Sequence, residues 1–124
     1  MNKIDNSDIT SIIIDFRSQD DFIKGHISKA MNIVVDTPPL NIHQLNKLYI
    51  ELDFLNLLKD TLIILYCTSG KRAKIAEDYF IKNGYTTVVN MGSFENIKKK
   101  TNNNICICET NKFSDVYPNT YLKP

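Results

Sequence analysis

Short apolar runs alternate with turn signals and helical stripes along the chain. The runs Ser11–Phe16 (SIIIDF) and Leu62–Tyr66 (LIILY) are nearly unbroken, which is typical of strands buried on both faces of a parallel sheet. Three further segments have the length or the β-branched content of strands: Met31–Val35, Tyr85–Asn90 and Ile105–Glu109. The pattern therefore predicts about five strands.

Helical spacing fills the intervals between these runs. Ser18 is a good N-cap, and Gly25 fits the C-terminal stop of a short helix. Residues 41–58 carry an apolar stripe that predicts one amphipathic helix, or two with a break. Two further helices are predicted. One follows the Cys67 loop with Ala73, Ala76 and Phe80 on one face and is closed by Asn83-Gly84, and the other covers residues 94–100.

Alternating strands and helices predict an α/β fold with a central, mainly parallel sheet of about five strands. Right-handed crossovers would place the helices on both faces of this sheet. The chain has 124 residues, which is the usual size of one domain with its own core. We therefore expect a single domain over residues 1–124, with residues 101–124 as a C-terminal extension.

Composition and charge narrow the classes of partner. The hydrophobic fraction of 43% and the charged fraction of 23% are ordinary for a soluble globular protein. The net charge of +1 gives no reason to expect binding to nucleic acid or to a membrane surface. The N-terminal stretch is polar and lacks the pattern of a secretory signal. We therefore expect a cytoplasmic protein.

Three cysteines are present, at positions 67, 106 and 108. An odd number does not suggest a secreted disulfide framework. Cys106 and Cys108 form C-x-C, which has too few ligands for a zinc site without further Cys or His close by. We expect no metal, and we interpret Cys106 and Cys108 as strand residues, with a role in resolving or relaying sulfur as the alternative.

The strongest chemical signal follows the strand at Leu62–Tyr66. Cys67 falls at its carboxyl end, where open α/β sheets place their ligands. Cations and helix N-termini lower the pKa of thiols from about 8.5, and tight Gly-containing loops turn backbone N–H groups inward as an anion cradle. Cys67 is therefore a candidate nucleophile, with an ordinary buried cysteine as the alternative. The candidate cradle comprises Thr68, Ser69, Gly70, Lys71 and Arg72.

These residues resemble the C-x-x-G-x-R active-site loop of rhodanese-like sulfurtransferases. Three other segments resemble motifs of the same family in the same order, over about residues 12–97. They are Asp15-Phe16-Arg17, the G-H-I-x-x-A-x-N-I segment from Gly25 to Ile33, and Asn83-Gly84-Tyr85 through Gly92. The sequence departs from the family pattern at Ala73, Ser93 and Ile97.

The resemblance implies a thiosulfate sulfurtransferase that works through a persulfide on Cys67. A small sulfur anion such as thiosulfate would be the donor, and a thiol or a thioredoxin-like protein would be the acceptor. No metal or organic cofactor is implied. Asp15 and Arg17 are interpreted as structural support that pairs beside the loop, and His26 is interpreted in the same way. Of the two loop cations, Arg72 has the better case for binding an oxyanion or a loop carbonyl.

Two alternatives remain at this stage. One is a rhodanese-like binding or regulatory module with little turnover. The other is a Cdc25-like phosphatase or arsenate reductase, which has a C-x5-R loop with one more residue than the spacing from Cys67 to Arg72. The shorter loop suits a bound sulfur atom better than a tetrahedral phosphate, so it favours the sulfurtransferase.

Overall fold

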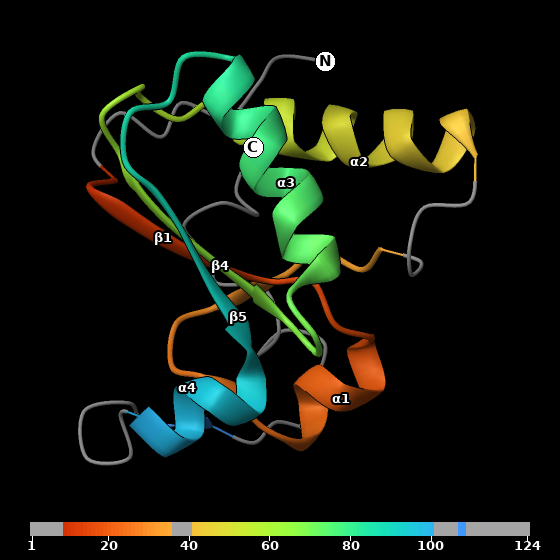
Figure 1. Ribbon diagram of the computed structural model, residues 1–124, viewed down its shortest axis with the longest axis vertical. Helices are drawn as coiled ribbons and strands as arrows, with labels where there is room; N and C mark the ends of the chain where they lie inside the picture. The colour runs from red at the N-terminus through yellow and green to blue at the C-terminus, as the bar shows by residue number, and fades with distance from the viewer. Residues whose placement is uncertain (1–8, 36–40, 101–106, 109–124) are drawn as a thin grey trace.

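A four-stranded parallel sheet forms the centre of the computed structural model, which describes residues 9–35, 41–100 and 107–108. The strand order is β3-β1-β4-β5, so the two most apolar strands are central (Figure 1). The register pairs Ser11 with Leu62 and Asp15 with Tyr66, so neighbouring strands end at one edge of the sheet. The bounds are Ser11–Asp15 (β1), Met31–Asn32 (β3), Leu62–Cys67 (β4) and Val88–Ser93 (β5).

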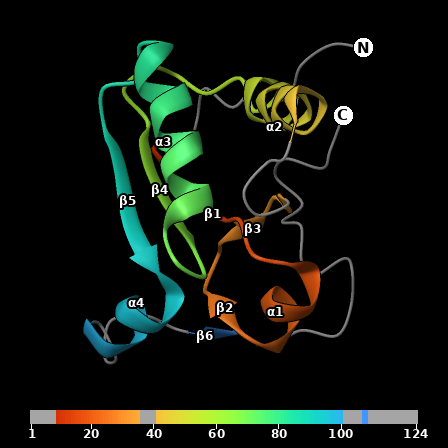
Figure 2. The same cartoon turned by 45° about the vertical axis from the view of Figure 1, so that its right-hand side comes forward.

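A second, two-stranded sheet lies beside the carboxyl ends of the main strands (Figure 2). In it β2, His26–Ile27, pairs antiparallel with β6, Ile107–Cys108. The strand predicted over Ile105–Glu109 is therefore confirmed for the part that the structure describes. The predictions for the N-terminal lead-in, for Cys106 and for the rest of residues 101–124 lie outside the described residues.

Helices cover both faces of the main sheet, as predicted. The pair α2 (Ile42–Phe54) and α3 (Lys71–Lys82) packs on one face, and the pair α1 (Gln19–Lys24) and α4 (Phe94–Lys100) packs on the other. In Figure 1, α3 lies in front of the strands, and α1 and α4 lie at the end where the strands finish. Among the described residues, no helix is long and apolar enough to cross a membrane.

Two separate cores follow from the alternation of side chains along β1 and β4. The larger core joins the first face to α2 and α3 and includes Ile14, Leu48, Ile63, Leu65, Cys67, Ala73 and Phe80. The smaller core joins the second face to α1 and α4 and includes Phe22, Ile27, Tyr66, Phe94 and Ile97. Leu62 and Ile64 on the second face are only half-buried. The prediction that this strand is buried on both faces is therefore right for its carboxyl half and wrong for its first half, because α1 and α4 pack near the strand ends.

Local signals explain where two helices begin and end. The Ser18 hydroxyl accepts a hydrogen bond from the Asp21 N–H at 3.2 Å, which caps α1 as predicted. The helix predicted over residues 41–58 is shorter in the structure, where α2 ends at Phe54. The physical reason is Asn56, whose φ of 49° lies in the left-handed region and stops the helix.

One strand boundary was predicted wrongly. The pattern predicts a strand over Tyr85–Asn90 followed by a turn at Gly92, whereas β5 is Val88–Ser93. Tyr85 instead donates its N–H to the Phe80 carbonyl at the end of α3. Pairing with β4 starts at Val88, and Gly92 continues the strand with a φ of 81° because β5 bulges there. The pairing of β5 with β4 therefore decided where the strand begins, although Thr86 and Thr87 have a high β propensity.

Candidate functional site

The Cys67 loop is the candidate site, and it joins the end of β4 to the start of α3. The Gly70 N–H donates to Cys67 Sγ at an N–S distance of 2.9 Å. Gly70 has a φ of 94°, in the left-handed region that favours glycine. The loop therefore turns a backbone dipole with its positive end toward the sulfur, which stabilises negative charge on it.

The Cys67 side chain is fully buried, at 0% exposed. It belongs to the larger core, where Leu65 and Ala73 are also buried. Burial alone would fit an ordinary core cysteine. The Gly70 N–H argues against an ordinary core cysteine, because a loop conformation that favours glycine directs this N–H at the Cys67 sulfur.

The Arg72 guanidinium points toward the protein. Its Nη1 donates to the carbonyl oxygens of Phe16 at 3.0 Å and of Val35 at 3.2 Å. Its Nη2 donates to Thr68 Oγ1 at 3.2 Å. Arg72 therefore ties the loop to the chain that follows β1 and β3. From the sequence, Arg72 was expected to bind either an oxyanion or a carbonyl group, and these contacts fit the second role.

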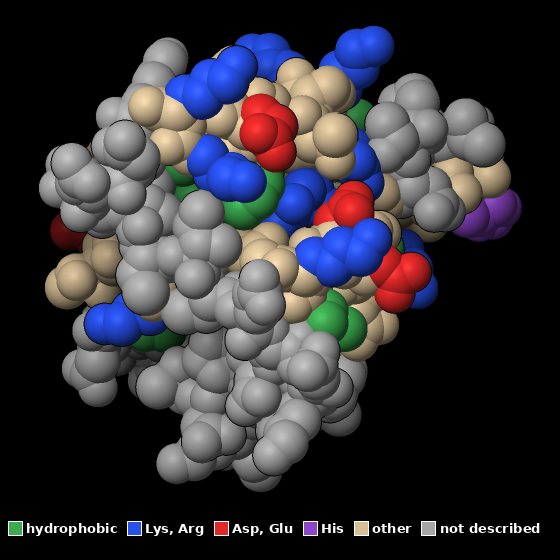
Figure 3. All heavy atoms as spheres, turned by 90° about the horizontal axis from the view of Figure 1, so that it is seen from below, with side chains coloured by type: hydrophobic (Ala, Val, Ile, Leu, Met, Phe, Trp, Pro, Cys, Tyr) green, Lys and Arg blue, Asp and Glu red, His purple; other side chains and the backbone are tan. Residues whose placement is uncertain are grey.

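The other loop side chains lie on the open side. Thr68, Ser69 and Lys71 are exposed. Figure 3 shows the face where the strands end, and Lys and Arg side chains gather there with a few acidic residues among them. Lys71 is thus a loop cation whose side chain faces solvent, in contrast to Arg72.

A buried ion pair lies at the end of β1, next to β4 in the sheet. The Arg17 guanidinium binds both carboxylate oxygens of Asp15, with the shortest contact at 2.8 Å. Arg17 also donates to the Gly25 carbonyl at 2.7 Å and lies 3.9 Å from the centroid of the Phe94 ring. Burial alone would lower the pKa of Arg17, but the hydrogen bond and the charge of Asp15 outweigh it and the pKa is raised.

Asn32 holds the backbone around this ion pair, and we call Asp15, Arg17 and Asn32 together the brace. Its Nδ2 donates to the carbonyl oxygens of both Asp15 and Arg17 at 2.9 Å. Asn32 was given no role from the sequence, although it belongs to the segment that resembles the family. An amide within a short apolar strand segment was the available signal, since buried amides need hydrogen-bond partners.

Tyr66 joins the brace to α1 and β2. Its hydroxyl accepts a hydrogen bond from the Ile27 N–H at 3.2 Å. Burial, with the nearby negative charge of Asp15, raises the pKa of Tyr66. The hydroxyl therefore stays protonated well above the range where a free tyrosine ionises.

His26 packs against α1. Its ring stacks on Phe22 with centroids 3.7 Å apart, and its Nδ1 lies 2.8 Å from the Phe22 carbonyl. His26 is buried, at 4% exposed. Both contacts hold α1 against β2, and they do not connect the ring to Cys67.

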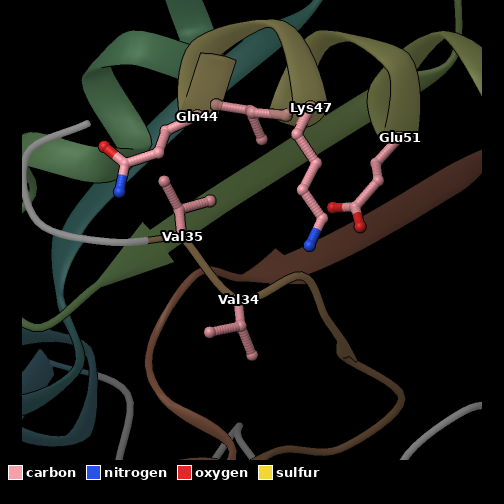
Figure 4. Close-up of a pocket in the computed structure, with 6 residues that line it drawn as sticks. Val34, Val35, Gln44, Lys47 and Glu51 are labelled. Carbon is pink, nitrogen blue, oxygen red and sulfur yellow. The ribbon is translucent and has the colours of Figure 1, made fainter. Parts of the chain in front are cut away.

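A hollow that the sequence analysis did not predict lies between α2 and the segment after β3 (Figure 4). It has a volume of about 190 Å³. Burial raises the pKa of Glu51 on its wall, and the charge of Lys47 partly opposes that rise. The hollow adjoins the segment that Arg72 binds, and its lining is Val34, Val35, Gln44, Lys47, Leu48 and Glu51.

Taken together, the fold and the loop define a class of protein. A parallel α/β sheet carries a cysteine at the end of a central strand, and a Gly-containing loop turns a backbone N–H toward the sulfur. The family model of the rhodanese-like domain matches residues 1–100. The chain therefore belongs to the rhodanese-like domain family, as the resemblance in its motifs indicated.

Two curated relatives show how varied that family is. A probable molybdopterin-synthase adenylyltransferase of Gracilaria tenuistipitata var. liui is 39% identical over 72 residues, which is 58% of this chain and 18% of that protein. A putative mitochondrial thiosulfate sulfurtransferase of Schizosaccharomyces pombe is 28% identical over 94 residues, which is 73% of this chain and 64% of that protein. The chain therefore spans less than two thirds of either relative.

A solved structure supports the fold. A rhodanese with anions from E. coli is similar to this chain with a TM-score of 0.55 and 19% sequence identity. The match covers 80% of this chain and 98% of that one. At this identity the likeness shows the fold alone, and it agrees with the central parallel sheet described above.

Proposed function

We propose that this protein is a sulfurtransferase that carries a sulfane sulfur as a persulfide on Cys67. The observation that carries the proposal is the Gly70 N–H directed at Cys67 Sγ at 2.9 Å. A preorganised donor of this kind stabilises a thiolate on Cys67 without any rearrangement of the loop. Membership of the rhodanese-like family supports sulfurtransferase-type chemistry.

The reaction would proceed in two half-reactions. The Cys67 thiolate attacks the outer sulfur of thiosulfate, a sulfur–sulfur bond forms, and sulfite leaves with the electron pair of the broken bond. An acceptor thiolate, from a small thiol or a thioredoxin-like protein, then attacks the outer sulfur of the persulfide. This step releases the Cys67 thiolate, so the cycle is covalent catalysis with ping-pong kinetics. The cytoplasm, which keeps thiols reduced, suits this chemistry.

The loop geometry also bears on the two alternatives. The Arg72 guanidinium is engaged with three protein oxygens, from Phe16, Val35 and Thr68, which disfavours a phosphatase that needs it for a phosphate. The full burial of Cys67 favours the second candidate, a binding module with little turnover, because a donor must reach a sulfur that is 0% exposed.

Intact-mass measurement after incubation with thiosulfate separates these functions. We expect wild-type protein to gain one sulfur atom, and to lose it on addition of a thiol. The Cys67→Ser variant should gain none, while Lys82→Ala, an exposed position in the last turn of α3 away from the loop, is a control that keeps the thiol and should still gain it. Absence of the adduct in folded wild-type protein would favour the binding module, and an adduct that survives Cys67→Ser would refute the assignment of the nucleophile.

A further inference from the structure

The bulge in β5 lies directly against the Cys67 loop. Leu65 pairs with Asn90, and the next pair along the two strands is Cys67 with Ser93. Over this interval β4 advances by two residues and β5 by three, so β5 carries one extra residue. Gly92, with a φ of 81°, makes this possible, since β-bulges often use a glycine in the left-handed region.

The Asn90 side chain links the bulge to the loop. Its Oδ1 accepts a hydrogen bond from the Gly92 N–H at 2.8 Å, which closes the bulge. Its Nδ2 donates to the Gly70 carbonyl at 3.4 Å, a long bond. One amide therefore contacts both glycines, and Asn90 itself is half-buried.

Shape reinforces this link. A Cβ added at Gly70 would lie 3.3 Å from Gly92 Cα, which is tighter than most such contacts, so the backbone of Gly92 packs closely against Gly70. The Gly70 carbonyl also accepts the Lys74 N–H at 3.0 Å, in the first turn of α3. The residue that donates to Cys67 Sγ is thus held by the helix, by the bulge and by Asn90.

We infer that Asn90 is a positioning residue for the Cys67 loop. It fixes the bulge, and the bulge and its amide together set the orientation of the Gly70 N–H relative to Cys67 Sγ. This inference rests on the proposed function for its kinetic consequence, because the oriented N–H would stabilise the thiolate and the persulfide. Its structural content, the coupling of Asn90 to Gly70, can be tested without any turnover.

The test follows the backbone amide resonances of the glycines by NMR. The chain contains four, so full-length protein labelled with ¹⁵N-glycine should give one amide resonance for each. In Asn90→Leu, which removes both hydrogen bonds, we expect the Gly70 and Gly92 resonances to move and those of Gly25 and Gly84 to stay. We also expect persulfide formation from saturating thiosulfate to slow by about tenfold, since even small misplacements of catalytic groups can cost this much or more. KM should change little.

Two other variants make the test specific. Asn83→Leu is the matched control, because Asn83 Nδ2 donates to the Tyr79 carbonyl at the far end of α3. It should lower stability without moving the Gly70 resonance or the rate. Asn90→Asp keeps an acceptor for the Gly92 N–H and loses the donor to Gly70. Asn90→Asp should move the Gly70 resonance more than that of Gly92. If Asn90→Leu does not fold, Asn90→Asp takes its place in the test.

Each outcome decides the inference. It is overturned if the Asn90 variants leave the Gly70 resonance where it is, whether or not the rate falls. It is also overturned if Gly70 moves while a measurable wild-type rate of persulfide formation is unchanged. If wild-type protein forms no persulfide at all, the proposed function fails by itself, and the Gly70 resonance alone then supports or refutes the coupling.

Discussion

Two arginines follow the two central strands, and they differ in what their charges bind. Arg17, after β1, is paired with the buried Asp15 carboxylate and is itself 6% exposed. Arg72, after β4, binds backbone carbonyls and a hydroxyl, and within residues 9–35, 41–100 and 107–108 it pairs with no carboxylate. The charge of Arg17 is thus neutralised by the Asp15 carboxylate, whereas the Cys67 loop keeps the positive charges of Lys71 and Arg72.

This difference separates a structural role from a chemical one. A buried and fully paired ion pair is costly to break, but it offers no charge to a ligand. A loop with a buried thiol, a directed N–H and two cationic side chains can attract and hold an anion. Substitutions in the brace should therefore change stability first, and substitutions in the loop should change persulfide chemistry first.

The largest effect is expected from breaking the brace with Asp15→Ala. This leaves the Arg17 guanidinium buried without its carboxylate, so we expect the free energy of unfolding to fall by about 3–5 kcal/mol. Urea unfolding followed by circular dichroism measures the loss, and the folded fraction should keep its rate of persulfide formation. Asp20→Ala, on the exposed first turn of α1, is the control. A small loss in Asp15→Ala, similar to that of the control, would show that the pair is not a brace.

An intermediate effect is expected from Arg72→Lys. A lysine cannot reproduce the fork that contacts Phe16, Val35 and Thr68, so we expect a loss of stability of about 1–3 kcal/mol. Persulfide formation should slow by about tenfold, because the base of the loop is no longer fixed.

Stopped-flow loading with thiosulfate and urea unfolding together measure the effects of Arg72→Lys. Lys74→Ala on the same helix is the control, since Lys74 pairs with Glu77 and Asp78 on the exposed surface. If Arg72→Lys is destabilised as expected but loads at the wild-type rate, Arg72 belongs with the brace and not with the chemistry.

The smallest effect is expected from Lys71→Ala. Lys71 is exposed, so its charge should steer an anionic donor without fixing the loop. We expect KM for thiosulfate to rise by about threefold at low salt, with kcat and stability unchanged, and the difference to shrink as salt screens the charge. Initial rates at two ionic strengths measure this. A fall in kcat that salt does not reduce would mean that Lys71 contacts the reacting sulfur.

Much of the fold could be predicted because its signals are local. Apolar runs identified β1 and β4, the Ser18 cap identified the start of α1, and the segment Phe94–Lys100 was predicted with its observed bounds. The spacing from Cys67 to Arg72 likewise indicated the loop, and together with three further motifs in order it indicated the family. Each of these features depends on residues that are neighbours along the chain.

Contacts between distant segments were decided by tertiary structure. The extent of β5, the contact of Gly70 with Gly92 and the link through Asn90 depend on how β5 pairs with β4, which no local pattern specifies. The direction of the Arg72 side chain depends on carbonyl groups that follow β1 and β3. The sequence by itself determined which residues form the loop, and only the packed sheet decided which groups hold its N–H against the sulfur, because hydrogen bonds and close packing arise between segments that folding brings together.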